Sequence, residues 1–358
     1  MTLPIVSILW LNYNSSNFIE IILESLTAIA NLDYPKDQYE LIVVDNGSTD
    51  NSYGVIKNFL EKQTGLNKKI IRLSRNLGFT GGNNVAYKVI NRNSEYIVLL
   101  NNDAVPTPES LKMMVDFLHT HPSVGSLQGI LVMYDNPLEV EDAGFFMDEL
   151  LLAHSFLVKS PPFILRKPVF VTYTCGAYNM YRILALKKVG CINKLFSDIM
   201  FAYFDDSVLG LKLWNIGYKS AVIPEVTGRH VLNLSFGKTS PNKVYYSIRG
   251  WTVLNEITNS RYKKLIRALI PTLSTRVALT NIGREFLDIG NVTLNHIRAG
   301  IRGYVDGIRL SRIFKEKINI YNAPIIKISN PQYIVKLLLK RASVSRTISR
   351  YILNIFDK

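Results

Sequence analysis

The sequence is poor in cysteine and lacks long apolar runs. Its 358 residues include only two cysteines, Cys175 and Cys191. Neither a disulfide framework nor a cysteine zinc site is therefore expected, and a reducing compartment fits best. No stretch approaches the ~18 uninterrupted apolar residues of a membrane-spanning helix. The first residues enter a strand pattern without the basic segment and apolar core of a signal peptide. We therefore expect a cytoplasmic protein that does not span a membrane.

Several nucleotide- and nucleic-acid-binding motifs are also missing. The sequence has no G-x-x-x-x-G-K-[ST] pattern, which disfavours a P-loop NTPase. Its glycine-rich segment, residues 75–84, is expected to form a polar loop that leads into a helix. It follows the third predicted strand, whereas the fingerprint of a Rossmann dehydrogenase follows the first. Zinc fingers, RNP-like motifs and interleaved aromatic platforms are absent as well. We therefore expect no nucleic-acid partner.

Basic residues are concentrated in the last third of the chain. The net charge is +14. Residues 243–358 hold 21 Lys and Arg against 6 Asp and Glu, whereas residues 1–242 hold 21 against 22. An apolar content of 47% supports a sizeable core, in one large domain with an appendage or in two domains. A charge asymmetry of this kind is typical of proteins that bind nucleic acid or an anionic membrane face, and because the nucleic-acid motifs are missing we expect the membrane face.

Strand and helix patterns alternate through the first half of the chain. Strand-like apolar runs occupy residues 6–11, 41–45, 70–73 and 96–100, and helical spacing of apolar residues separates the first three of them. A βαβαβ order favours a parallel sheet with right-handed crossovers, which is an α/β fold. The basic last third loses this alternation and has a helical pattern instead.

Two of these strands end in acidic turns. Asp45 closes the second strand, and Asn101, Asn102 and Asp103 close the fourth. Ligands of open α/β sheets bind just outside the carboxyl ends of the strands. We therefore expect Asp45 and Asp103 to face a common ligand.

The motifs around these turns, taken in order, resemble family 2 glycosyltransferases, whose nucleotide-sugar-binding fold is called GT-A. The resemblance covers roughly residues 4–240 and is nearest to the subgroup of rhamnosyl- and galactofuranosyltransferase-like proteins. It implies an α/β GT-A domain over residues 1–242, with a nucleotide-binding half (1–103) and an acceptor and catalytic half (104–242). It also implies that Asp45 binds the nucleobase and that the donor nucleotide contacts Asn12, Tyr13, Asn14, Asp45, Asn46, Ser48, Arg75, Asn76, Gly78, Gly81, Asn83, Asn101 and Asn102.

The same resemblance makes the 101–103 turn the metal-binding D-x-D motif. Its first acid is replaced by Asn101 here, and an Asn carbonyl can still bind a hard divalent cation. Relatives place a metal-binding histidine at a distance beyond the catalytic acids that matches His230. We therefore expect Asp103, His230 and Asn101 to hold Mg²⁺ or Mn²⁺. Ordinary turn chemistry is the alternative for residues 101–103, and a structural role is the alternative for His230.

A second acidic motif begins at Asp205. Asp205 and Asp206 resemble the acidic pair of the family's E-D-x-D-L-x-x-R motif, in which Asp206 falls on the catalytic base. Val208 replaces the later acid and Lys212 the arginine. A carboxylate suits removal of a proton from an acceptor hydroxyl, although acids also favour a helix N-terminus. Gly176, Ala177 and Asp205 are assigned to the acceptor side by the same resemblance.

The resemblance to this family implies an inverting, metal-assisted transferase acting from a UDP- or dTDP-sugar onto a glycan or polyprenyl-linked hydroxyl. The last third, residues 243–358, carries an apolar stripe from Val344 to Phe356 with Arg346 and Arg350 opposite. A basic amphipathic helix of this kind suits the cytoplasmic face of an anionic membrane, and packing onto a protein surface is the alternative. A homo-oligomer and a catalytically silent GT-A-like scaffold stay open, the latter because Asn101 and Val208 replace two acids.

Overall fold

The computed structural model describes residues 3–231, 240–275, 293–314 and 317–330, together with residues 332, 349 and 353. The stripe predicted between Val344 and Phe356 lies outside these residues. No helix among them is long and apolar enough to cross a membrane.

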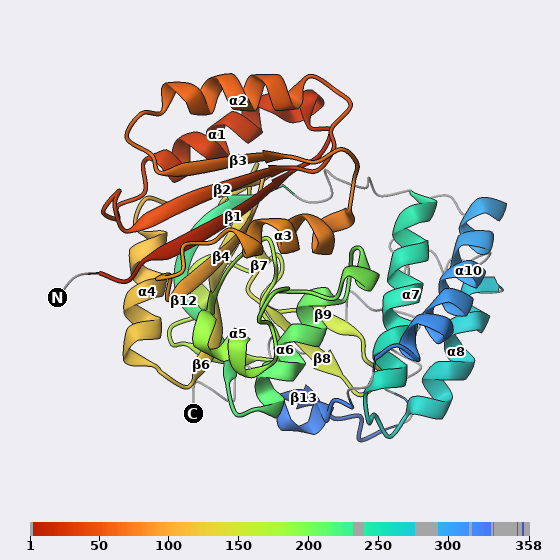
Figure 1. Ribbon diagram of the computed structural model, residues 1–358. Coiled ribbons are helices and arrows are strands. Elements are labelled where there is room, and N and C mark those ends of the chain that lie inside the picture. Colours follow the sequence, from red (N-terminus) through yellow and green to blue (C-terminus); the bar gives the residue numbers. More distant parts are fainter. Residues whose placement is uncertain are drawn as a thin grey trace.

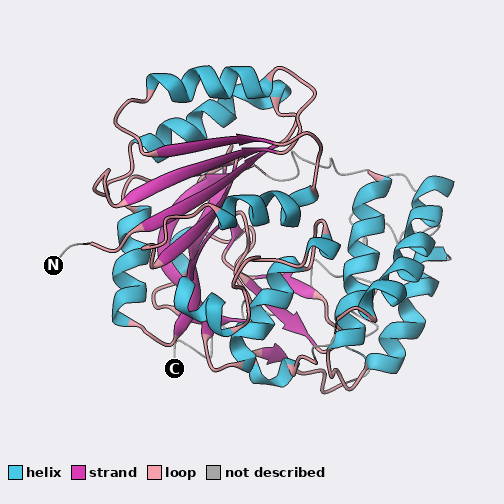
Figure 2. Ribbon diagram, in the orientation of Figure 1, coloured by secondary structure: helices cyan, strands magenta, loops and turns pink. Residues whose placement is uncertain are grey.

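A mixed sheet of ten strands forms the centre of the molecule (Figure 2). Its main path runs β10-β12-β6-β11-β4-β1-β2-β3, with β5 paired to β12 and β7 to β6. The strands are β1 (Val6–Asn12), β2 (Tyr39–Asp45), β3 (Lys68–Arg72), β4 (Tyr96–Asn101), β5 (Ala104–Pro106), β6 (Val124–Met133), β7 (Val140–Asp142), β10 (Val169–Val171), β11 (Tyr178–Arg182) and β12 (Lys219–His230). A small second sheet contains β8 (Phe145–Asp148), β9 (Ala153–Ser155) and β13 (Ile325–Ile326).

The amino-terminal half has the predicted parallel arrangement. β1 pairs in parallel with both β2 and β4, and β2 pairs in parallel with β3. Helices α1 and α2 lie on one side of these strands and α3 on the other (Figure 1). The helices of this half are α1 (Ile19–Ala30), α2 (Ser52–Lys62), α3 (Gly78–Lys88) and α4 (Ser110–Thr120). All seven residues of β2 are buried, as the continuous apolar run of a parallel strand predicts.

One prediction for this half needs correction. The glycine-rich segment was expected as a loop that leads into a helix, but α3 already begins at Gly78 and includes Gly81, Gly82 and Asn83. A Cβ on Gly82 would stand 2.4 Å from Cδ1 of Leu11, and a Cβ on Gly81 would stand 2.6 Å from Cβ of Leu77. These glycines therefore allow α3 to pack closely, with Gly82 against β1.

The second half adds α5 (Ile183–Lys188), α6 (Asp205–Asn215) and the carboxyl-terminal helices α7 (Pro241–Ile257), α8 (Lys263–Thr275) and α10 (Leu294–Ser311). Short 3₁₀ turns occur at η1 (Ser16–Phe18), η2 (Pro162–Ile164), η3 (Asp198–Met200) and η5 (Ile320–Asn322). The start of α7 has a strong local signal, because Pro241 occupies its first turn and the Ser240 side chain accepts a hydrogen bond from the Asn242 N–H.

The carboxyl-terminal helices share a core with the second half of the sheet domain. Ile248, Trp251 and Leu254 of α7 belong to the same buried cluster as Met147 and Leu150. The Trp251 indole also donates a 3.0 Å hydrogen bond to the Leu150 carbonyl. The boundary at residue 242 stays a prediction. Helix α7 nevertheless packs directly onto the second half of the sheet domain, and α8 and α10 pack against α7 (Figure 1).

Candidate active site

A cavity of about 370 Å³ opens where β1 and β4 end and α3 and α7 begin. Its position agrees with the rule that ligands of open sheets bind outside the carboxyl ends of the strands. Six of the residues predicted to contact the donor line this cavity: Tyr13, Asn46, Asn76, Gly78, Asn101 and Asn102. Phe201, Asn242 and Tyr246 close it from the second half of the chain, and no sequence motif marks these three residues.

Asp45 lies at the end of β2 and is almost fully buried. Its Oδ1 accepts a 2.9 Å hydrogen bond from the Asn12 side chain, and its Oδ2 accepts a 3.2 Å bond from the Ser48 N–H. Arg72 adds an ion pair at 3.6 Å. Asn12 and Ser48 therefore orient this carboxylate, while the residues that line the cavity lie beside it.

The other predicted donor residues are arranged around this network. Asn14 has a positive φ of 46°, and its side chain accepts a 2.8 Å hydrogen bond from the Thr49 N–H, which ties the first strand turn to the second. Arg75 is exposed. Gly81 and Asn83 are buried within α3, where the Asn83 side chain donates to the Phe79 carbonyl. Their contact with a donor stays a prediction.

Asp103 and His230 face each other, although 127 positions separate them in the sequence. The His230 Nε2 lies 3.2 Å from the Asp103 Oδ1, and that buried oxygen accepts no hydrogen bond from any described residue. The reason is strand register. β12 pairs antiparallel with β5 so that His230 is opposite Ala104, the residue that follows Asp103.

Glu141 of β7 completes this group from the other side of the imidazole. Its Oε2 lies 3.0 Å from the His230 Nδ1. Burial alone would lower the pKa of His230, but the carboxylates of Asp103 and Glu141 outweigh it and raise that pKa to about 10. No sequence motif marks Glu141, because no spacing pattern connects β7 with β12.

The pair formed by Asp103 and His230 fits a divalent cation. A buried carboxylate oxygen without a hydrogen bond faces an imidazole nitrogen, and both are donors for such ions. Glu141 lies on the opposite ring nitrogen, where an outer carboxylate orients a ligating histidine. No cluster of three or more His, Cys, Asp or Glu side chains suited to a metal occurs among the described residues. Further ligands would have to come from elsewhere, such as donor phosphates.

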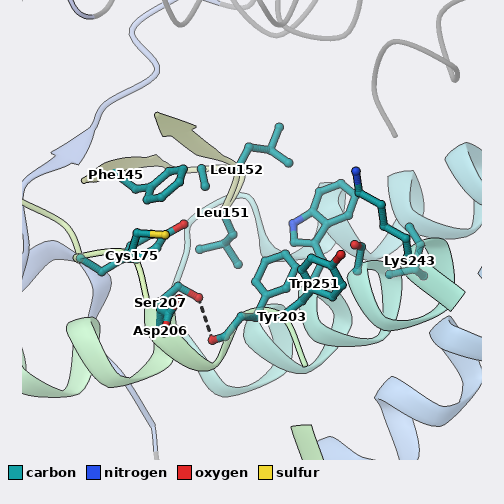
Figure 3. A pocket seen from close by; sticks show the side chains of 14 residues that line it. Phe145, Leu151, Leu152, Cys175, Tyr203, Asp206, Ser207, Lys243 and Trp251 are labelled. Carbon is teal, nitrogen blue, oxygen red and sulfur yellow. Dashed lines mark hydrogen bonds between the residues drawn. The ribbon is translucent and has the colours of Figure 1, made fainter. Parts of the chain in front are cut away.

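A second cavity, of about 470 Å³, contains Asp206. Cys175 and Asp206 lie at one end, Lys243 lies at the other, and Leu151 and Trp251 lie between them (Figure 3). Ten of its fourteen lining residues are aliphatic, aromatic or cysteine: Phe145, Leu151, Leu152, Ala153, Tyr173, Cys175, Tyr203, Phe204, Ile248 and Trp251. Asp206 is the one acid in this lining.

The Asp206 carboxylate is only half satisfied. Its Oδ2 accepts a 3.0 Å hydrogen bond from the Gly176 N–H, whereas its buried Oδ1 has no partner among the described residues. Burial raises the pKa of Asp206 well above its usual range, and the neighbouring Asp205 raises it further. A raised pKa of this kind suits a general base.

The remaining predicted acceptor-side residues lie in different places. Gly176 contacts Asp206, as described above. Ala177 is buried, and its carbonyl accepts a 2.9 Å hydrogen bond from the Asn101 N–H. Asp205 lines a separate cavity of about 400 Å³ with Val208 and Lys212. Burial raises the pKa of Asp205 to about 6.

Comparisons with known proteins identify the family and the fold of this chain. The family model described as glycosyl transferase family 2 matches residues 7–190, slightly more than half of the chain. The chain is 33% identical over 112 residues to the poly(ribitol-phosphate) beta-N-acetylglucosaminyltransferase TarS of Staphylococcus aureus. That match covers 31% of this chain and only 18% of TarS.

A longer match joins the chain to a Methanococcus voltae protein, a dolichyl N-acetyl-alpha-D-glucosaminyl phosphate 3-beta-D-2,3-diacetamido-2,3-dideoxy-beta-D-glucuronosyltransferase. The two are 23% identical over 67% of this chain and 71% of the relative.

Solved structures show the same fold. TarS residues 1–349 in complex with UDP-GlcNAc superimpose with a TM-score of 0.52 and 20% identity, over 85% of this chain and 81% of that one. The mannosyltransferase PcManGT of Pyrobaculum calidifontis, in complex with GDP-Man and Mn²⁺, gives a TM-score of 0.52 and 17% identity, over 100% and 89%. The expected fold is confirmed, and the chain belongs to glycosyl transferase family 2 with a GT-A fold.

Proposed function

We propose that this protein is an inverting glycosyltransferase that moves a sugar from a UDP- or dTDP-linked donor to a hydroxyl group, with Asp206 as the general base. The half-satisfied carboxylate of Asp206 is the observation that carries this proposal. Its Oδ1 is buried in a cavity without a hydrogen bond, although a buried acceptor atom normally finds a partner. An acceptor hydroxyl is the partner that this position suits.

The proposed reaction assigns distinct tasks to the chain's residues. The Gly176 N–H holds Oδ2, which leaves Oδ1 to accept the acceptor proton. As the acceptor oxygen bonds to the anomeric carbon, the bond from that carbon to the donor phosphate breaks. Its electron pair leaves with the nucleoside diphosphate. The proton ends on Asp206, and attack opposite the leaving group inverts the anomeric centre. Proton transfer to a positioned carboxylate contributes ~10²–10⁴-fold to such rates.

A divalent cation, Mg²⁺ or Mn²⁺, would be held by Asp103 and His230, with Asn101 as a further oxygen donor. Its chemistry would be to neutralise negative charge that gathers on the departing diphosphate. The support is the 3.2 Å approach of the Asp103 Oδ1 to the His230 Nε2, together with the Mn²⁺ named in the PcManGT complex.

The donor base would be read by Asp45, because a carboxylate can accept a hydrogen bond from the imide N–H of either uracil or thymine. The complex of TarS with UDP-GlcNAc supports a pyrimidine donor. The acceptor would be a hydroxyl of a glycan or of a polyprenyl-linked glycan. The names of the two relatives support these acceptors, since one acts on a poly(ribitol-phosphate) and the other on a dolichyl-linked sugar.

We further propose that the carboxyl-terminal region binds the cytoplasmic face of an anionic membrane. Helix α10 exposes Leu294, Ile301 and Val305 together with Arg298 and Arg302. A helix surface with apolar and basic side chains suits a bilayer interface. Flotation with vesicles of anionic phospholipid, compared with vesicles of neutral phosphatidylcholine, tests this. Equal recovery with both vesicle types would contradict it.

The test of the reaction uses Asp206→Asn. A panel of UDP- and dTDP-sugars is first screened for thermal stabilisation in Mn²⁺, because a ligand that binds only the folded state raises the unfolding midpoint. With the donor so found, Asp206→Asn should reduce turnover by at least ~10²-fold while nucleotide affinity is retained. Asp37→Asn, an exposed acid before β2, is the control and should behave as wild type. Near-normal turnover by Asp206→Asn would exclude Asp206 as the base.

A further inference from the structure

A short segment between η3 and α6 has an unusual backbone. Phe201, Tyr203 and Phe204 all have positive φ angles, of 58°, 67° and 65°. Residues other than glycine rarely adopt a positive φ, because their Cβ then crowds the backbone. Such conformations persist where the surrounding structure imposes them, and they cluster at functional sites. This segment therefore needs contacts that hold it in place.

The same segment lines two of the cavities described above: the cavity of about 370 Å³, here called the donor-side cavity, and the cavity of about 470 Å³ that contains Asp206, here called the acceptor cavity. Phe201 lines the donor-side cavity, whereas Tyr203 and Phe204 line the cavity that contains Asp206. Asp205 and Asp206 follow directly in the chain. The Phe201 carbonyl also accepts a 3.2 Å hydrogen bond from the Thr80 N–H in α3. A displacement of this segment would therefore disturb both the lining of the donor-side cavity and the position of the proposed base, Asp206.

Helix α7 supplies the contacts that hold it, chiefly through Arg249. The Arg249 Nη2 donates a hydrogen bond to the carbonyl of Met200, the residue before the first positive φ. Its guanidinium lies over the rings of Tyr245 and Tyr246, at 5.2 and 4.8 Å from their centroids. Tyr246 in turn stacks on Phe201, with centroids 4.7 Å apart and planes 9° apart.

The next residue of α7 is shaped for the same segment. A Cβ on Gly250 would stand 2.5 Å from Cδ2 of Phe204, so the absence of a side chain lets that ring pack against the helix. Two consecutive residues, Arg249 and Gly250, thus contact opposite ends of the strained segment.

Arg249 makes no ion pair with the part of the chain that the structure describes. It is only 7% exposed. Its Nε has no hydrogen-bond partner among the described residues. A buried cation without a counter-ion is costly, and one carbonyl and two aromatic rings offset only part of that cost. Its position therefore points to a task in holding the backbone at Met200.

We propose that Arg249 is a positioning residue, which holds the segment 200–204 so that Phe201 shapes the donor-side cavity and Asp206 points into the acceptor cavity. This proposal rests on the proposed function for its effect on turnover. It also gives α7, which lies beyond the family match at residues 7–190, a direct part in the active site.

The first test needs no substrate. Hydrogen exchange is compared in wild type, Arg249→Met and Arg302→Met. Arg302 of α10 also lies over the Tyr245 ring, at 5.9 Å, but no contact joins it to the segment among the described residues, which makes it a matched control. In Arg249→Met, peptides covering residues 78–82 and 198–206 should exchange at least about tenfold faster, because the Thr80 N–H loses its fixed acceptor. Wild-type exchange in both peptides would overturn the proposal.

Arg249→Lys covers the case in which Arg249→Met does not fold. Lysine keeps the charge but lacks the planar group that bonds a carbonyl while stacking on rings. The segment should therefore still exchange faster than in wild type. Wild-type exchange in this variant would show that charge alone suffices and would overturn the positioning role.

The second test reads the two cavities separately. Arg249→Met should weaken UDP affinity by about 3- to 10-fold, the scale of one lost aromatic contact. It should also lower kcat at saturating donor by ~10–100-fold, as expected when a reacting group is misplaced by about 1 Å. A merely destabilised variant would lose active protein but keep the wild-type UDP affinity and pH profile in the folded fraction. That result would contradict the proposal. If the wild-type protein showed no turnover, only the proposed function would be refuted. Hydrogen exchange and UDP affinity would still test the role of Arg249.

Discussion

The carboxylate of Asp206 lies directly against the backbone of Gly176. Its Oδ2 accepts the Gly176 N–H at 3.0 Å, and a methyl group on Gly176 would stand 2.9 Å from Oδ1 and 3.1 Å from Cζ of Phe79. The Gly176 φ lies outside the positive range, so the requirement for glycine here is space and not backbone conformation. A glycine next to a proposed base thus sets how closely that base can approach its hydrogen-bond donor.

Gly176→Ala should therefore lower turnover with little change in donor affinity. The added methyl group would push Asp206 away from its hydrogen bond, and a misplaced base costs ~10–100-fold in rate. Steady-state kinetics with the donor identified by thermal shift measure this effect. Gly65→Ala is the control, because a Cβ there meets nothing within 4 Å. Equal kcat in Gly176→Ala and wild type would show that the contact does not matter for chemistry.

Asp45→Ala should weaken nucleotide binding. The variant removes the proposed acceptor for the base and leaves the Asn12 side chain without one of its partners. We expect a 10- to 100-fold higher Kd for UDP by calorimetry, or ~1.4–2.8 kcal/mol. Asp45→Asn retains one oxygen acceptor, so its Kd for UDP should lie between the values of wild type and Asp45→Ala. Unchanged UDP affinity in both variants would rule out the assigned role of Asp45.

Glu141→Gln should reduce metal affinity without abolishing the fold. Its carboxylate lies 3.0 Å from the His230 Nδ1 and orients the ring toward Asp103. Loss of such an outer partner costs ~10–100-fold in metal affinity. The concentration of Mn²⁺ needed for half-maximal stabilisation of the UDP complex is the readout. Glu139→Gln, two residues earlier in the chain, is the control. Removal of metal with EDTA should abolish that stabilisation in wild type.

Asp205 should make folding stability fall as pH rises. Burial raises its pKa from an ordinary 3.8 to about 6, so the folded state favours the protonated form. The stability that this group contributes is fully present below pH ~4, is lost as pH rises through about 6, and is absent above pH ~7. Asp205→Asn does not titrate. The free energy of unfolding of Asp205→Asn minus that of wild type should therefore be ~1–3 kcal/mol larger at pH 7.5 than at pH 4.

Urea unfolding at several pH values measures this difference. Asp206 and Asp142 also have raised pKa values, so wild-type stability falls with pH for more than one reason. The difference between wild type and Asp205→Asn isolates the contribution of Asp205. A difference that stays constant from pH 4 to pH 7.5 would contradict the raised pKa.

Local patterns predicted much of the fold and part of the site. Apolar runs and helical spacing predicted β1 to β4 and the parallel order of the first half, because side-chain periodicity is a local property of the backbone. The positions of Asp45 and Asp103 at strand ends followed from the same pattern. The acidic pair at residues 205–206 was identified by its resemblance to a family motif. In the structure Asp206 and Asp205 line two different cavities, and their roles stay a prediction.

The sequence by itself therefore determined the four parallel strands of the first half, the helices between the first three of them, and the acids at or just after the ends of β2 and β4. Only the tertiary structure decided which of these acids meet. Asp103 lies next to His230 because β12 pairs with β5 in one register. Glu141 contacts the same imidazole because β7 and β12 both pair with β6. The contact of Arg249 with Met200 joins residues 49 positions apart through the packing of α7. Such contacts depend on strand register and helix packing between distant segments, which no local spacing of residues encodes.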